Sequence, residues 1–166
     1  MVDIQTVSIV VASAGVFVAA IYYILQIRHQ RKMRQTDLIM RLYSTWGGKE
    51  YQEALFRHLA ANFKDYNDFV KKYGPIPSPN VSALNDVQIS FQMVGTFFEG
   101  LGVLLSEKLV DINLVQKLFA VKVYWEKTEP LMKELRKQHS PALWEWFEYL
   151  YNEVKRREQQ LASKPA

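Results

Sequence analysis

The chain of 166 residues contains no cysteine, which excludes disulfide bonds and thiolate metal sites. Glycine and proline are scarce, with seven and six residues respectively, so strong turn signals are few. The alternation of polar and apolar residues that is typical of strands is also missing. These absences favour helices over sheets, and an apolar content of 49% is too high for a disordered chain.

Motifs of the common enzyme classes are missing too. The chain has no His-Glu-x-x-His, no Gly-x-Ser-x-Gly and no Gly-x-x-x-x-Gly-Lys-Ser/Thr. His58 and His139 each follow a glutamate by five residues, a spacing that turns the two side chains to different helix faces, and His29 lies in a basic segment. We therefore predict no metal, no cofactor and no enzymatic activity.

Excess positive charge is confined to one short segment. The formal net charge is +4, and residues 28–34 hold four basic side chains without an acidic one: Arg28, Arg31, Lys32 and Arg34. Without these four, seventeen basic side chains balance seventeen acidic ones. A nucleic-acid partner needs a broad basic face, so this distribution argues against one.

The N-terminal region predicts a transmembrane helix. Ile4 to Ile27 are 24 consecutive uncharged residues, enough to cross a hydrocarbon core of about 30 Å at 1.5 Å per residue. Tyr22 and Tyr23 lie near one end of this segment, where tyrosine favours the membrane interface. The run is too long for a secretory signal and lacks a basic start.

The basic segment predicts the orientation of that helix. No Lys or Arg precedes it, and the basic residues that follow place the C-terminal domain in the cytoplasm and the N-terminus outside the cell membrane. Arg28, Arg31, Lys32 and Arg34 either set this orientation only or also contact anionic lipid headgroups.

A stripe of small residues follows one side of the predicted membrane helix. Its members recur at spacings of four, three and four: Ser8, Ala12, Gly15 and Ala19. Such stripes let helix backbones approach closely in lipid, which predicts association with a partner or a second copy. The alternative is a single anchor in which the small residues are incidental.

The remainder of the chain predicts helices throughout. We expect one N-terminal transmembrane helix and a cytoplasmic bundle of four to five helices, an all-α fold. Helix ends are expected at Gly47-Gly48 and Gly74-Pro75, and helix caps at Asp65, Asp111 and Ser140; Pro130 should kink or restart a helix. The predicted organisation is a transmembrane anchor (1–27), a basic stalk helix (28–46), a helical domain (47–160) and a polar tail (161–166).

Glu99 is the one charged residue in the apolar run from 95 to 105. Gly95, Glu99 and Gly102 share one side of a helix, so the two glycines leave a depression beside the carboxylate into which a neighbouring helix can pack. A structural role needs a hydrogen-bond donor, for which we consider Arg41, His58, Trp46, Trp125 or a tyrosine hydroxyl. A catalytic role would need a second functional group, and the spacing shows none.

The chain resembles a known family in the segment from 97 to 119. Phe98-Glu99-Gly100, the turn at 106–108, Asp111 and Trp125 match short membrane-anchored helical proteins of archaea and bacteria that are grouped as a domain of unknown function. The resemblance covers residues 1–140. It implies a helical fold and a membrane anchor, and it brings no activity, ligand or catalytic residue.

Three functions follow from these patterns. The first is a membrane-anchored, non-enzymatic interaction protein that serves as an accessory, assembly or scaffolding subunit of a larger membrane complex. The second is a sensor or effector module that the basic segment couples to lipid. The third is an uncharacterised enzyme that uses Glu99.

Overall fold

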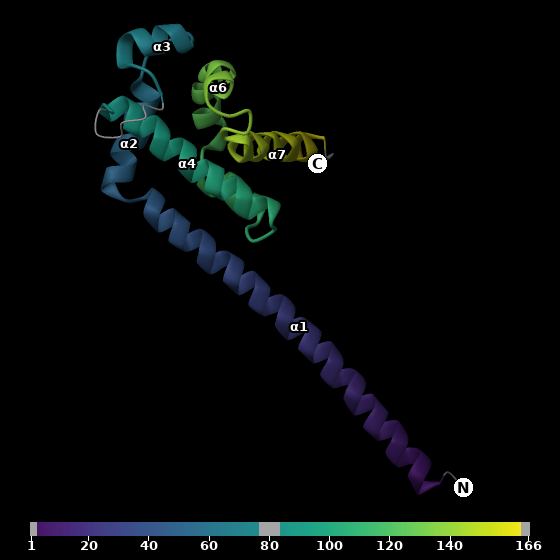
Figure 1. Ribbon diagram of the computed structural model, residues 1–166. Coiled ribbons are helices and arrows are strands. Elements are labelled where there is room, and N and C mark those ends of the chain that lie inside the picture. Colours follow the sequence, from purple (N-terminus) through teal and green to yellow (C-terminus); the bar gives the residue numbers. More distant parts are fainter. Residues whose placement is uncertain (1–2, 77–83, 164–166) are drawn as a thin grey trace. The chain divides into compact units, whose positions relative to one another are not determined.

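The computed structural model describes residues 3–76 and 84–163. Within these ranges the chain forms helices and no strand, so the all-α prediction is confirmed. The helices are α1 (Ile4–Trp46), α2 (Lys49–Ala60), α3 (Tyr66–Tyr73), α4 (Asp86–Ser106), α5 (Ile112–Leu118), α6 (Val121–Gln138) and α7 (Glu145–Ala162) (Figure 1). Residues up to Leu38 form one compact unit and residues from Ile39 onward form a second.

The second unit is a helical bundle built around α4. α4 packs against both α2 and α7, and α6 packs against α7. Its inward stripe includes Phe91, Val94, Phe98 and Leu101, each at most 1% exposed. Burial of such a stripe supplies most of the stability of a bundle of this size.

Aromatic side chains fill much of the core. Trp46, in the last turn of α1, is 8% exposed, and five rings surround it with centroids at 5.2–5.5 Å: Tyr51, Phe97, Phe98, Phe119 and Tyr124. Phe98 also stacks on Phe147 of α7 at 4.6 Å. These edge-to-face, tilted and stacked ring contacts contribute stability in addition to the area that the rings bury.

Several helix boundaries agree with the sequence patterns. α1 ends at Trp46, directly before the two glycines. The side chain of Asp65 accepts a hydrogen bond from the N–H of Asp68 at the start of α3, and Asp111 accepts one from Asn113 at the start of α5. Gly74 follows α3 with a positive φ of 82°, a conformation that favours glycine.

Other boundaries differ from the expectation. The helix expected to run from Asp111 towards Pro130 is broken at Phe119, whose backbone is extended. Within residues 3–76 and 84–163, six helices therefore follow α1, where four or five were expected. Pro130 lies inside α6, which continues to Gln138 without restarting. The last helix begins at Glu145 and not after Ser140, because residues 141–144 form a turn.

Candidate functional site

The apolar segment of α1 exposes large hydrophobic side chains. Ten of them between Ile9 and Leu25 are 51–72% exposed: Ile9, Val11, Val16, Phe17, Val18, Ile21, Tyr22, Tyr23, Ile24 and Leu25. Two helices in the described ranges are long and apolar enough to cross a membrane, α1 and α4. In the most apolar window of α1 no residue is buried, whereas 44% of the α4 window is buried, as expected for a core helix.

The small-residue stripe and the basic segment are both on the surface of α1. Ser8, Ala12, Gly15 and Ala19 are exposed, and nothing lies within 4 Å of a Cβ added at Gly15. At 100° per residue the four positions fall on one side of the helix. Arg28, Arg31, Lys32 and Arg34 are exposed as well.

Glu99 lies at the contact between α4 and the start of α7. Its Oε2 atom accepts a hydrogen bond of 2.8 Å from the backbone N–H of Phe147. The donor is therefore a main-chain amide and differs from the side chains that the sequence suggested. α7 has no side-chain cap of its own, since Trp144 occupies the N-cap position. Glu99 thus caps a helix that begins 46 positions further along the chain.

The two glycines explain how closely the helices approach. A Cβ added at Gly102 would lie 2.0 Å from the carbonyl oxygen of Trp146, and one added at Gly95 would lie 2.2 Å from the indole of Trp144. Both distances are shorter than any side-chain contact tolerates. The structure brings Gly95, Glu99 and Gly102 together against the segment 144–147.

The environment of Glu99 has opposing effects on its charge. Burial raises the pKa of Glu99 above its usual value of 4.5, and the backbone N–H groups of Phe147 and Trp146 act in the opposite direction. Nearby Glu145 raises the pKa further and Arg136 lowers it. Because Oε2 accepts from the amide of Phe147, the carboxylate holds the first turn of α7 against α4.

Arg136 of α6 holds the turn that precedes α7. Its Nε donates to the carbonyl oxygen of Leu143 at 3.0 Å, and one Nη lies 2.6 Å from a carboxylate oxygen of Glu148. The backbone of Trp144 in between has φ of 51°, a left-handed conformation that is costly for a residue other than glycine. Its burial at 5% exposure against Gly95 offsets that cost.

A second polar contact lies between α2, α4 and α6, and the sequence patterns missed it. His58 is fully buried, and its Nε2 lies 3.1 Å from the hydroxyl of Thr128. The burial of His58 could have been predicted from its position, because it follows Tyr51 and Leu55 on the apolar face of α2 at spacings of four and three.

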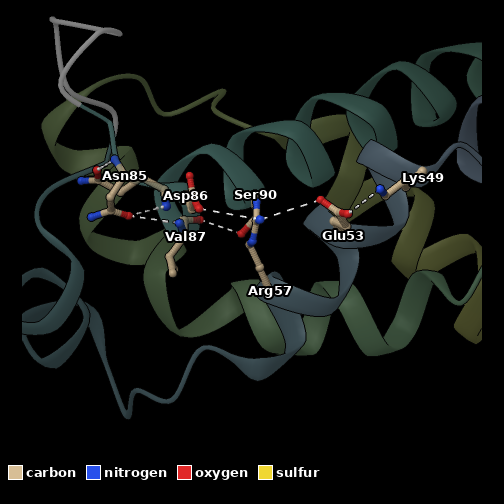
Figure 2. A network of polar contacts seen from close by, with 8 residues as sticks. Lys49, Glu53, Arg57, Asn85, Asp86, Val87 and Ser90 are labelled. Carbon is tan, nitrogen blue, oxygen red and sulfur yellow. Dashed lines mark hydrogen bonds and ion pairs between the residues drawn. The ribbon is translucent and has the colours of Figure 1, made fainter.

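An ion-pair chain runs along the surface from α2 to the first turn of α4 (Figure 2). Lys49, Glu53 and Arg57 follow one another at intervals of four, and Arg57 reaches Asp86 at 3.7 Å. Asn85 caps α4 through a reciprocal pair of hydrogen bonds with Gln88. The exposed ion pairs contribute little stability, so the cap by Asn85 stabilises this end of α4 more than they do.

Between Val87 and Ser106, α4 carries one charged residue, Glu99, which faces α7. Ile89 and Val103 are each 38% exposed on α4, and Gly100 has nothing within 4 Å of an added Cβ. Beside this helix lies a groove of about 370 Å³ lined by Tyr51, Gln92, Met93, Thr96 and Phe97.

Metal ligands do not gather in the parts of the chain that the structure describes. Residues 3–76 and 84–163 contain no group of three or more His, Asp or Glu side chains that could hold an ion.

Comparison with protein-family models matches residues 9–154 to one family, described as a domain of unknown function (DUF4760). The match extends beyond residue 140 into α7 and includes the contact between Glu99 and Phe147. No curated protein and no solved structure matches the chain.

Proposed function

The chain belongs to the DUF4760 family, a domain of unknown function, and we propose that it is a membrane-anchored, non-enzymatic interaction protein. In this role residues 4–27 span the cell membrane, the N-terminus lies outside, and the helical bundle lies in the cytoplasm. The protein serves as an accessory, assembly or scaffolding subunit of a larger membrane complex.

The exposed apolar surface of α1 carries the proposal. Ten large hydrophobic side chains between Ile9 and Leu25 are each more than half exposed, an arrangement that a water-soluble helix does not tolerate. The 24 uncharged residues are long enough to cross the hydrocarbon core of a bilayer, where lipid would cover this apolar surface. The acid-free segment that follows supports the cytoplasmic placement of the bundle.

Single cysteines test the topology directly, because the natural chain has none. We expect a membrane-impermeant maleimide to label Asp3→Cys on intact cells and Lys64→Cys only after lysis. Both positions are exposed, so accessibility within the protein does not limit the reaction. The reverse labelling pattern would refute the orientation, and release of the chain by an alkaline carbonate wash would refute the anchor.

The small-residue stripe supports a partner within the bilayer. We expect Gly15→Leu with Ala19→Leu to dissociate a complex that is purified from membranes in mild detergent, because both side chains would block close backbone approach. Ser13→Leu with Ala20→Leu adds similar volume to the same helix at positions more than about 100° away from the centre of the stripe, and serves as the control. An assembly that is unchanged by the first pair, or equally lost with both pairs, would exclude the stripe as the contact.

The exposed basic segment favours a second candidate function, a module that is coupled to anionic lipid. Each basic residue near an anionic surface adds about 1 kcal/mol of attraction. We expect the full chain to co-purify with anionic lipids, and replacement of Arg28, Arg31, Lys32 and Arg34 by glutamine to abolish their enrichment. The control variant replaces four exposed lysines outside this segment by glutamine and so removes the same number of positive charges: Lys49, Lys64, Lys71 and Lys117. Equal enrichment in both variants would reject this function.

A further inference from the structure

His58 occupies the centre of the contact between α2, α4 and α6. Its side chain is completely buried. Its ring centroid lies 4.0 Å from that of Phe91 on α4 and 5.7 Å from that of Tyr124 on α6. Burial of a histidine in an aromatic environment is tolerated only when the ring is neutral or its charge is compensated.

The hydrogen bonds identify which ring nitrogen carries the proton. The hydroxyl of Thr128 donates its single hydrogen to the carbonyl oxygen of Tyr124 at 2.8 Å. The same hydroxyl therefore accepts at its contact of 3.1 Å with Nε2 of His58, so Nε2 is the protonated nitrogen. Nδ1 is left with a lone pair and no hydrogen-bond partner within the described residues.

Among the residues that the structure describes, none offers an acceptor for a second proton on this ring. It would create an N–H group at Nδ1, which is buried and unpartnered, and it would place a positive charge beside Lys127 of α6. Tyr124, which is also titratable, contacts the ring from α6. The charged groups at the contact of α2 with α4 are Glu53, Arg57 and Asp86, whose side chains are at least 46% exposed.

We propose that His58 makes the contact between α2, α4 and α6 sensitive to acid, so that protonation of the ring releases α2 from the bundle. The closed arrangement accepts only the neutral ring, whereas an open arrangement hydrates the imidazolium. Burial, with a smaller contribution from Lys127, lowers the pKa of His58 to about 3, so at mildly acid pH the proton binds only to the open form. This behaviour belongs to the bundle alone and holds whether or not residues 4–27 cross a membrane.

The expected effect follows from the two pKa values. With an ordinary value of 6.5 in the open form and about 3 in the closed form, the opening equilibrium constant rises about 30-fold between pH 7.5 and pH 5.0. The rise begins as the pH falls below 6.5 and ends near pH 3, because both forms are protonated below that value.

A cysteine in α2 measures this opening in the full chain. Ala54 is 3% exposed, so Ala54→Cys reacts with a dithiodipyridine reagent only when α2 opens, while Ala60→Cys at the exposed end of α2 gives the reference rate. We expect the rate ratio of the two thiols to rise about 30-fold from pH 7.5 to pH 5.0, and less than threefold when His58→Gln is added. A constant ratio in the parent chain, or the same rise with His58→Gln, would overturn the proposal.

Nitrogen NMR of the ring supplies a measurement that needs no substitution. We expect His58 in the folded chain to show the neutral pattern with the proton on Nε2 at pH 7.5 and still at pH 5.0. If the ring titrates near pH 6.5 while the chain stays folded, or carries its proton on Nδ1, the closed contact accepts the charge and the proposal fails.

Discussion

Replacement of Gly102 by alanine tests the contact between α4 and α7 with one added methyl group. The new Cβ would lie 2.0 Å from the carbonyl oxygen and 2.6 Å from the carbonyl carbon of Trp146. Ordinary contact begins at 3.4 Å, so the backbone of α7 must retreat by about 1.4 Å. The obstacle is main chain, which cannot rotate away as a side chain can.

The retreat has a second cost at Glu99. Its hydrogen bond to Phe147 is 2.8 Å long, and the same movement would take it beyond hydrogen-bonding distance. Overpacking costs about 1–3 kcal/mol, and a polar group left without its partner costs a similar amount. Alanine recovers about 1 kcal/mol through its helix propensity. We expect Gly102→Ala to lower the free energy of unfolding by about 1–5 kcal/mol in total.

Gly100 provides the matched control on the same helix. It has nothing within 4 Å of an added Cβ, so Gly100→Ala should raise stability by about 0.5–1 kcal/mol through propensity alone. The assay is denaturant unfolding of the full chain in detergent, followed by the circular dichroism of its helices. Shifts of equal sign in the two variants, or a loss below about 1 kcal/mol for Gly102→Ala, would refute the packing account.

Substitutions at three further positions probe the helix ends. Glu99→Ala should lower the free energy of unfolding by about 1–3 kcal/mol, and Glu99→Gln by less, since the amide oxygen of glutamine still accepts from Phe147. Folding raises the pKa of Glu99, so the folded parent chain should lose stability as the pH rises above 4.5, and Glu99→Gln should remove this loss. Melting curves recorded at several pH values check both expectations. Arg136→Gln should cost about 1–2 kcal/mol by releasing the carbonyl of Leu143 and by breaking its ion pair, whereas a melting curve identical to that of the parent would show that α6 does not hold this turn. Asn85→Ala should cost about 1 kcal/mol through loss of the α4 cap, measured by the same unfolding assay, with Asn85→Asp expected to retain most of it.

Local signals in the sequence were sufficient for several elements. A glycine pair ends α1 at Trp46, and the side chains of Asp65 and Asp111 cap the helices that follow them, because these interactions involve residues within a few positions of one another. The inward face of α4 was equally visible, since its apolar residues recur at the period of a helix.

Boundaries that tertiary contacts decide were not predictable in this way. Phe119 interrupts a continuous apolar pattern without a glycine or proline, and its ring packs at 5.2 Å from Trp46 in the core. Ser140 and Pro141 form a good helix start, yet α7 begins at Glu145, where Glu99 reaches the amide of Phe147. The preference of Ser140 and Pro141 for a helix start contributes less stability than these long-range contacts.

The long distance in sequence between partners also limited prediction of the polar contacts. The sequence placed Gly95, Glu99 and Gly102 on one side of a helix, but its donors for Glu99 were side chains. A main-chain amide carries no sequence signature, so the amide of Phe147 could not be identified. His58 shows the converse case: its position on the apolar face of α2 was visible, whereas its partner Thr128 is 70 residues away.

The cap of α7 by Glu99 also sets an order of events during synthesis. α4 is synthesised before Phe147, because the donor lies 48 residues after Glu99 in the chain. Until then the carboxylate lacks this donor, and the segment 144–147 is not yet present to cover Gly95 and Gly102. The first turn of α7 can therefore close against α4 only after residue 147 has been added to the chain. A chain that stops short of Phe147 leaves α4 without the helix that its two glycines accommodate.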